Sequence, residues 1–412
     1  MLKFGVVVTL TLSDITAKGK LHLGTLEDAM SSISLTPFDV SVTDFLSDFS
    51  RQLLKSVQVK RMPDVVSLAY WCRRANLDQM KQQYGDTTSC VGRGVVFHIP
   101  PNNVPLNFAY SLFAGLLSGN SNIVRLSSAE SPEVSEVLKV LSQLKESGYW
   151  TDVAKRICVF EYGHEDSVTT SLSLMTDARV IWGGDRTVQH IRSLPTRPRS
   201  IDISFADRVS ISLISADGLL SLTDEELRDV ATRFYVDGYT FNQNACSSPR
   251  LLVWQGSEKE VSVASRKFWE TLDIVSETRN EVEPVHVMNR LVEMCEGLVE
   301  HENIDHVTGL TTAALKVSLK DAKKWEEVSS LRFGTFSEVR ISELRELEEL
   351  LDEKVQTIGY FGYTASDFLG DDMGGVRGCV DRIVPLGQAL SFELKWDGYD
   401  LIRYLSRHVV VR

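Results

Sequence analysis

The sequence lacks closely spaced cysteines, and this absence excludes several kinds of site. Its six cysteines are scattered along 412 residues, and the two nearest in sequence, Cys72 and Cys90, are too far apart to form a CxxC pair. A zinc knuckle and an iron–sulfur run are therefore excluded, and we expect no metal centre. Few and unpaired cysteines in a chain of this length are typical of a reducing compartment, so we expect a cytoplasmic protein.

Apolar runs long enough for a membrane are also missing. The apolar stretch at residues 5–12 is short, has no small-residue cleavage site after it and is soon followed by Lys18 and Lys20, so we expect no signal peptide. No run approaches the roughly 18 apolar residues of a membrane-spanning helix, and we predict no membrane span.

Basic residues are outnumbered. Lys and Arg total 44 against 56 Asp and Glu, a formal net charge of −12. Because such a surface repels phosphate backbones, we expect no general binding to nucleic acid. Hydrophobic residues make up 43% and charged residues 24% of the chain, which excludes a disordered or fibrous protein. The length predicts two or three domains.

An alternation of short β-branched runs with helical stretches begins at Val91. Strands are expected at residues 95–99, 122–126, 157–161, 178–182 and 209–215. Helices are expected at residues 106–118, from Ser131-Pro132 to Gly148, and from Asp185. Strand–helix–strand units of about 30 residues predict an α/β fold with a doubly wound parallel sheet, whose ligands bind at the carboxyl ends of the strands. No G-x-G-x-x-G sequence marks a phosphate site, so nucleotide binding needs other support.

A second block opens at Thr223, which forms a capping box with Glu226 at the start of a helix that ends near Gly238. Strands are expected again at residues 356–364 and 382–386, and a charge-rich helix at 340–352. We therefore divide the chain into residues 1–220, 221–380 and 381–412. The last part is a C-terminal segment for oligomerisation or a return strand.

The segment at residues 241–249 places one cysteine, Cys246, among small polar residues just after this helix. A nucleophilic thiol needs solvent access and nearby donors that stabilise the thiolate, and such a loop can supply both. A half-buried structural cysteine is the alternative, and local chemistry alone favours it because buried thiols are common.

Two further segments follow expected strands. Asn103, in the run Pro-Pro-Asn-Asn-Val-Pro at residues 100–105, carries an amide that can donate to a developing oxyanion, although turn chemistry alone also explains Asn beside Pro. Gly183 and Gly184 end a strand and open a helix, where bare glycines suit a pyrophosphate and a plain tight turn is the alternative. His98, inside the first of these strands, is expected in the core.

Together these segments resemble the aldehyde dehydrogenase superfamily, and more closely the acyl-CoA reductases of the LuxC type. The matching runs occur in the same order between residues 91 and 403: FHIPPNNVPL at 97–106, GNSNIVR at 119–125, NQNACSSP at 242–249, RIVPLG at 382–387 and WDGYD at 396–400. The resemblance implies an aldehyde-dehydrogenase-like α/β fold, with a Rossmann-like NAD(P) cofactor domain and a second α/β catalytic domain. It also makes Cys246 the expected nucleophile.

The resemblance carries catalytic and cofactor roles to individual residues. Asn103 matches the amide that forms the oxyanion hole with the backbone N–H of the nucleophile. Arg125 falls where the superfamily has a Lys beside the adenosine ribose, and because a guanidinium suits a 2′-phosphate, we expect NADPH rather than NADH. Ser127 can assist Arg125, and Gly183 with Gly184 matches the glycine turn beside the pyrophosphate.

Two departures from the superfamily pattern bear on the reaction. Members that oxidise aldehydes carry a Glu that activates the hydrolytic water, and the matching residues 203–206 contain no carboxylate. A reductase of thioesters needs no such water, so this departure favours reduction. The second departure is Leu331, which stands where the superfamily has a Glu that holds the nicotinamide ribose.

We therefore expect NADPH-dependent reduction of an acyl thioester to the aldehyde, through an acyl group carried on Cys246. The donor is acyl-CoA or a carrier-bound acyl group. The alternatives are oxidation of an aldehyde to the acid, and a non-redox acyl-binding or partner subunit that shares the fold. The resemblance also leaves open an acyl-protein synthetase as partner and a homo-oligomer.

Overall fold

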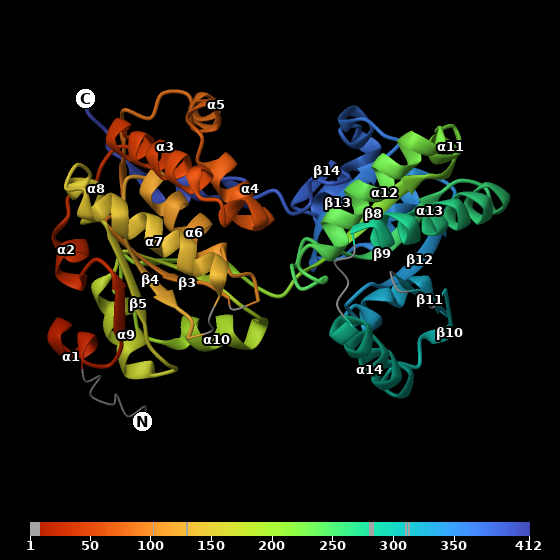
Figure 1. The fold of residues 1–412 in the computed structure, drawn as a ribbon, viewed down its shortest axis with the longest axis horizontal. Helices are drawn as coiled ribbons and strands as arrows, with labels where there is room; N and C mark the ends of the chain where they lie inside the picture. The colour runs from red at the N-terminus through yellow and green to blue at the C-terminus, as the bar shows by residue number, and fades with distance from the viewer. Residues whose placement is uncertain (1–8, 102, 129–130, 280–283, 310, 312–313) are drawn as a thin grey trace. The chain divides into compact units, whose positions relative to one another are not determined.

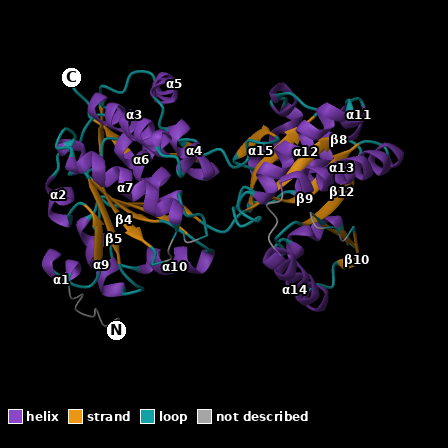
Figure 2. Cartoon of the chain, viewed as in Figure 1, coloured by secondary structure: helices purple, strands orange, loops and turns teal. Residues whose placement is uncertain are grey.

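The computed structural model describes residues 9–101, 103–128, 131–279, 284–309, 311 and 314–412. The chain forms two compact units (Figure 1). Unit 1 comprises Met1–Ala206 and Leu394–Arg412, and unit 2 comprises Asp207–Glu393. Helices pack against strands within each unit (Figure 2), and the α/β prediction is confirmed.

Unit 1 is built on a six-stranded sheet of order β1-β5-β4-β3-β6-β7. Its strands are β1 (Lys20–Leu23), β3 (Val95–Ile99), β4 (Ser121–Leu126), β5 (Ile157–Glu161), β6 (Ala178–Trp182) and β7 (Ile201–Phe205). The strands β3 to β7 are parallel, and β1 is antiparallel at one edge. Every residue of β3 and β6 is buried, and apart from His98 and Arg179 all of them are apolar, so the sequence made these strands easy to find.

The helices of unit 1 cover both faces of this sheet. They are α1 (Leu12–Thr16), α2 (Leu26–Ser31), α3 (Val40–Lys55), α4 (Pro63–Trp71), α5 (Arg74–Tyr84), α6 (Asn107–Leu117), α7 (Pro132–Glu146), α8 (Thr151–Ala154), α9 (Asp166–Met175), α10 (Asp185–Ser193) and α16 (Leu401–Leu405), with a short 3₁₀ helix η1 (Val59–Arg61). Helices α9 and α10 share an apolar cluster with Phe97, Ile123 and Ile181 of the sheet, and α6 and α7 lie over the opposite face (Figure 1). As expected, Ser131 caps α7, accepting a hydrogen bond from the backbone N–H of Val134.

Unit 2 is built on a seven-stranded sheet of order β10-β11-β12-β9-β8-β13-β14. Its strands are β8 (Val209–Ser215), β9 (Pro249–Gln255), β10 (Ile304–Thr308), β11 (Leu315–Leu319), β12 (Thr335–Ile341), β13 (Val355–Phe361) and β14 (Arg382–Pro385). Only the edge strand β10 is antiparallel to its neighbour among these strands.

Two groups of helices cover this second sheet. They are α11 (Ala216–Leu220), α12 (Asp224–Tyr239), α13 (Glu258–Arg279), α14 (Pro284–Glu300) and α15 (Gly374–Cys379), with the 3₁₀ helices η2 (Ala322–Val328), η3 (Leu344–Leu350), η4 (Ala365–Phe368) and η5 (Asp371–Met373). Helices α12 and α13 pack on Trp254 and Phe336, whereas η3 packs on the face that carries Val253.

The expected charged helix at residues 340–352 is wrong. Its first two residues complete β12, and the rest contains only the 3₁₀ helix η3. Leu347 and Leu350 of η3 are buried in the same apolar cluster as Ile341. The segment therefore folds tightly against the sheet and does not form a solvated α-helix.

The boundaries of the two units differ from the sequence-based division at both ends of unit 2. Residues 207–220 belong to unit 2, because β8 pairs in parallel with both β9 and β13. At the other end, residues 394–412 belong to unit 1, where β17 (Ser406–His408) pairs antiparallel with β2 (Cys90–Gly92) and β15 (Lys395–Trp396) pairs with β16 (Tyr399–Asp400). No helix in the described part of the chain is both long enough and apolar enough to cross a bilayer.

Candidate active site

The predicted oxyanion donor and the predicted cofactor residues of unit 1 follow three adjacent strands. Asn103 comes after β3, Arg125 and Ser127 lie at the end of β4, and Gly183 with Gly184 follows β6. The strand order reverses between β3 and β6, so these carboxyl ends form a topological switch point, the usual place for a ligand in an open α/β sheet. Asn103 is exposed in the loop between β3 and α6, and its neighbour Asn102 lies outside the described residues.

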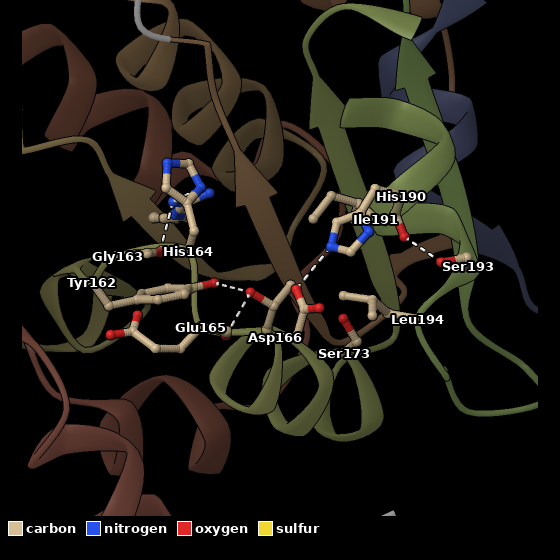
Figure 3. Close-up of polar contacts among 12 residues, drawn as sticks. Tyr162, Gly163, His164, Glu165, Asp166, Ser173, His190, Ile191, Ser193 and Leu194 are labelled. Atoms are coloured by element: carbon tan, nitrogen blue, oxygen red, sulfur yellow. Dashed lines mark hydrogen bonds and ion pairs between the residues drawn. The ribbon is translucent and has the colours of Figure 1, made fainter. Parts of the chain in front are cut away.

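Arg125 is held over the loop that follows β5. Its Nη2 donates to the carbonyl oxygen of Gly163 at 2.7 Å and lies 3.3 Å from Nδ1 of His164. Its guanidinium carbon lies 5.0 Å from the centre of the Tyr162 ring. After Tyr162 the chain continues through Gly163 and His164 into α9 (Figure 3). Burial raises the pKa of Tyr162 to about 12, so that ring stays neutral beside the cation. A half-buried positive charge is thus fixed at the end of β4.

Space is open in front of helix α10. Gly184 precedes the helix, and a Cβ built on it would meet no heavy atom within 4 Å. A Cβ on Gly183 would lie 3.1 Å from Cγ2 of Thr187. Free backbone N–H groups at a helix N-terminus attract anions, and bare glycines let a phosphate approach them. The residues present therefore fit the pyrophosphate of a dinucleotide, although Asp185 adds a negative charge there.

His98 is a core residue, as expected. It is fully buried, with Nδ1 2.7 Å from Oγ of Ser111 and Nε2 2.9 Å from Oδ1 of Asn122. Burial lowers its pKa to about 4. This neutral imidazole joins β3, β4 and α6, and it has no free nitrogen to offer a ligand.

The aromatic residues near the C-terminus pack against one another in unit 1. Tyr399 lies edge-on to Phe205 and to Tyr404, with ring centres 5.5 Å and 5.2 Å apart. Phe205 in turn stacks on Trp182 at 3.7 Å. These ring contacts anchor the returning segment to β6 and β7. Trp396 of the same segment is also buried, at 6% exposed.

The segment that carries Cys246 in unit 2, residues 240–248, is called the thiol loop below. It leaves α12 through two residues in the left-handed region, Asn242 (φ 50°) and Gln243 (φ 58°). Gln243 is fully buried: its Nε2 donates to the carbonyl oxygens of Pro249 and Thr335, and its Oε1 accepts from the N–H groups of Gly334 and Thr335. One side chain therefore ties the thiol loop to the starts of β9 and β12.

Cys246 is half-buried, and its sulfur has a polar neighbour. Nε2 of Gln356 donates to Sγ at 3.3 Å, and Oγ of Ser210 donates to the carbonyl oxygen of Cys246 at 2.8 Å. Ser210 and Gln356 lie at the beginnings of β8 and β13. The thiol thus sits at the amino ends of the strands of unit 2, the end opposite to the one that the topology of an α/β sheet predicts for a ligand.

A buried cation stands near this thiol. Arg250 is 8% exposed and donates to the carbonyl oxygens of Gln243 and, at 3.0 Å, of Leu331. Burial and the charge of Arg332 lower the pKa of Arg250 to about 9, whereas negative charges that include the Cys246 thiolate raise it. Neither Arg250 nor Gln356 was singled out from the sequence. Their only signal is a polar residue at the start of a strand that is otherwise buried.

A second buried group fixes the helix that leads into the thiol loop. The carboxylate of Asp237, on α12, accepts from the N–H of Gly387 at 2.6 Å and from the N–H of Ala389 at 3.1 Å. Burial raises its pKa to about 7, against these hydrogen bonds and the charge of Arg382, which lower it. The RIVPLG run of the sequence therefore packs behind the thiol loop.

The described residues show no cluster of three or more His, Cys, Asp or Glu side chains that would hold a metal ion. Leu331 is 5% exposed, and it offers the site only its backbone carbonyl, which Arg250 uses. It has no carboxylate, so the ribose contact that the resemblance expects at this position stays unassigned.

Comparison with known proteins shows the family. The profile described as acyl-CoA reductase (LuxC) matches residues 36–408. A long-chain acyl-protein thioester reductase of Aliivibrio fischeri is 26% identical over 167 residues, and one of Vibrio harveyi is 26% identical over 175 residues. These matches cover 40% and 41% of this chain but only 32% and 33% of the relatives.

Solved structures agree on the fold. Aldehyde dehydrogenase 21 of Physcomitrella patens matches 98% of this chain and 91% of its own length with a TM-score of 0.67 and 10% identity. Methylmalonate-semialdehyde dehydrogenase of Oceanimonas doudoroffii matches 98% and 92% with a TM-score of 0.62, also at 10% identity. The aldehyde-dehydrogenase-like α/β fold expected from the sequence is confirmed.

Proposed function

The chain belongs to the acyl-CoA reductase (LuxC) family, and we propose that it reduces an acyl thioester to the aldehyde with NADPH, through an acyl group bound to Cys246. One observation carries the proposal beyond family membership. The Cys246 sulfur accepts a hydrogen bond from a buried amide and lies near a buried guanidinium, which is the environment of a reactive thiolate. A structural cysteine needs neither group.

The first step is acyl transfer to the protein. The Cys246 thiolate attacks the thioester carbonyl carbon, a carbon–sulfur bond forms, and the tetrahedral intermediate collapses as the thiolate of CoA or of another carrier leaves and takes a proton from solvent. The resemblance gives Asn103 and the backbone N–H of Cys246 the role of oxyanion donors. A single such donor changes kcat by roughly 100-fold to 1000-fold, so Asn103→Ala should slow the reaction by that factor.

The second step is reduction of the acyl group on Cys246. A nicotinamide cofactor held through Arg125, Ser127, Gly183 and Gly184 would supply the hydride. The protein keeps the acyl carbon attached to sulfur until it is reduced, and the thiohemiacetal then expels the Cys246 thiolate and releases the aldehyde. Residues 203–206 contain no carboxylate that would activate water, which favours reduction of the acyl group over its hydrolysis.

The cofactor contacts proposed for this chain are those of unit 1. Gly184 faces open space and Gly183 precedes it, so we assign the pyrophosphate to this turn, and Arg125 with Ser127 stands where the adenosine ribose is expected. The guanidinium of Arg125 is the reason to propose NADPH in preference to NADH, because it can pair with a 2′-phosphate through two N–H donors.

The proposal is tested by NADPH oxidation with a series of acyl-CoA thioesters. We expect turnover that depends on acyl chain length, with the aldehyde as product, and its complete loss in Cys246→Ala. Cys295→Ala is the matched control, because Cys295 is an exposed cysteine of the same unit. Formation of acid from aldehyde and NADP⁺, with no reaction of thioesters, would replace the proposal with aldehyde oxidation.

The form of the acyl donor is the second question that this experiment answers. The curated relatives are named for acyl-protein thioesters, so a protein-bound acyl group delivered by a synthetase is the other donor that we propose to test. Binding of NADPH without turnover of any acyl-CoA would point to that donor. Sedimentation of the same preparation tests the predicted homo-oligomer.

A further inference from the structure

Two β-bulges flank the start of β8, an inner strand of the sheet of unit 2. On one side, Ser210 pairs with Pro249 and Ile211 with Leu251, which leaves Arg250 as an extra residue of β9. On the other side, Val209 pairs with Val355 and Ser210 with Thr357, which leaves Gln356 as an extra residue of β13. A bulge redirects a side chain away from the regular alternation of its strand, and bulges are frequent beside active sites.

Both extra residues are directed at the thiol loop. Gln356 donates to Sγ of Cys246 at 3.3 Å, and Arg250 donates to the backbone of Gln243 within the same loop. Ser210, between the two bulges, completes the arrangement. Its Oγ donates to the carbonyl oxygen of Cys246 at 2.8 Å and accepts from the N–H of Thr357 at 3.2 Å.

The position of Gln356 is unfavourable unless its amide is used. The residue is 1% exposed, and burying an amide without a partner costs about 1–3 kcal/mol. A thiol is a weak acceptor, whereas a thiolate accepts a charge-assisted hydrogen bond that is roughly twice as strong as a neutral one. The N–H of Gln356 therefore stabilises the charged form of Cys246 more than the neutral form.

We propose that Gln356 is a catalytic residue, whose amide N–H donates to the Cys246 sulfur and favours the thiolate that attacks the thioester. The thiol proton leaves to solvent, the N–H···S hydrogen bond persists on the thiolate, and no covalent bond to Gln356 forms or breaks. The buried guanidinium of Arg250 adds a fixed positive charge on the other side of β8. The inference rests on the proposed function only for the identity of the nucleophile.

The test measures the thiol directly and needs no substrate. The full-length protein is treated with iodoacetamide across a range of pH, and alkylation of Cys246 is followed by mass spectrometry of its peptide. In Gln356→Met, which keeps the volume and removes the donor, we expect the midpoint of the profile to rise by about one pH unit, which lowers the rate near neutral pH about tenfold. The exposed Cys295 serves as an internal reference whose profile stays unchanged.

Gln255→Met is the matched control. Gln255 lies at the other end of β9, where its Oε1 accepts from the hydroxyl of Tyr363 at 2.6 Å, so the same substitution leaves the thiol unaffected. Gln356→Glu is the second variant, because a carboxylate at this place repels the thiolate and raises the midpoint further than Met does. Hydrogen exchange of β13 peptides tests whether each variant is folded. If Gln356→Met is unfolded, the midpoint of the Cys246 profile in Gln356→Glu decides whether the proposal holds.

A Cys246 profile in a folded Gln356 variant that coincides with the wild-type profile would overturn the proposal. This outcome is separate from failure of the proposed function. If the protein reduces no thioester but the Cys246 profile shifts in Gln356→Met, the role of Gln356 as hydrogen-bond donor stands and the proposed reaction is wrong. If the Gln356→Met variant reduces acyl-CoA at the wild-type rate and its Cys246 profile does not shift, the proposed reaction stands and the role of Gln356 is wrong.

Discussion

The two units share the order of their parallel core strands, yet their candidate residues occupy opposite ends of the sheets. In unit 1 the core is β5-β4-β3-β6-β7 and in unit 2 it is β12-β9-β8-β13-β14. Each chain segment starts at a central strand, runs outward to one side and then returns to the other side. The order therefore reverses between β3 and β6 in unit 1, and between β8 and β13 in unit 2.

The carboxyl ends at these two reversals differ in the space they leave. In unit 1 a Cβ on Gly184 would meet nothing within 4 Å. In unit 2 a Cβ on Gly362 would lie 2.5 Å from the Cβ of Ser215, and the hydroxyl of Tyr363 reaches across to Gln255. At the carboxyl ends of unit 2 the chain after β13 thus passes close to β8, and the thiol loop lies at the other end of the strands.

One strand topology therefore supports two kinds of candidate site in this chain. The candidate residues of unit 1 are exposed or half-buried, and Gly184 among them faces open space, whereas the half-buried Cys246 of unit 2 lies in a loop that the buried polar residues Gln243, Arg250 and Gln356 hold. Substitutions in unit 2 should therefore reduce the stability of that unit, and substitutions at the cofactor residues of unit 1 should change only binding.

The largest effect is expected from Gln243→Leu in unit 2. The substitution leaves the N–H groups of Gly334 and Thr335 and two buried carbonyls without their partner, which should lower the free energy of unfolding of unit 2 by about 4 kcal/mol. Hydrogen exchange of β12 peptides measures the change, and β3 peptides of unit 1 serve as the reference. A loss below about 1 kcal/mol would show that the loop does not depend on this side chain.

A pH titration of unit 2 should show the burial of Asp237. The pKa of Asp237 in the folded state, about 7, lies above its ordinary value of 3.8, so the folded unit binds the proton more tightly than the unfolded chain does. The protonated carboxyl therefore contributes to the free energy of unfolding in full below pH 3.8, and this contribution is lost as the pH rises to 7. The loss amounts to about 4 kcal/mol at most. Protection factors of α12 peptides between pH 4 and 7 measure it, and Asp237→Asn should remove the slope. An equal slope in the variant would assign the dependence to another group.

Unit 1 should show the opposite slope because of His98. Its pKa falls from the ordinary 6.5 to about 4, so the contribution to stability is full above pH 6.5 and is lost as the pH falls towards 4. The expected loss is about 3 kcal/mol. Protection factors of β3 peptides over this window provide the measurement, with His98→Gln as the variant that should flatten it. If the stability of both units changed with pH in the same direction, Asp237 and His98 would not be the groups responsible.

The smallest effect is expected from Arg125→Gln in unit 1. Loss of the guanidinium should raise the Kd for NADPH about tenfold, or about 1.4 kcal/mol, and leave the Kd for NADH and the protection of β4 peptides unchanged. Quenching of protein fluorescence measures both constants. Arg192→Gln, in the last turn of α10, is the matched control. Equal losses for both cofactors would mean that Arg125 does not face a 2′-phosphate.

Local patterns were sufficient for much of the fold. The strands at 95–99, 157–161, 178–182 and 209–215 have the bounds that their apolar runs predicted, and Thr223 and Glu226 form the expected capping box. Such features depend on residues that are neighbours in sequence. The membership of β8 in unit 2 depends on pairing with β9 and β13, and no local signal distinguishes it from a further strand of unit 1.

The family, the alternation of elements and the candidate thiol could all be predicted from the sequence, because they depend on motif order and on periodicity along the chain. Only the tertiary structure decided which groups surround that thiol and at which end of the sheet it lies. Gln356 is 110 positions from Cys246, and a single extra residue in β13 directs its amide at the sulfur. Register between distant strands is set by packing and pairing across the sheet, so a polar residue inside a strand reveals its target only in the folded protein.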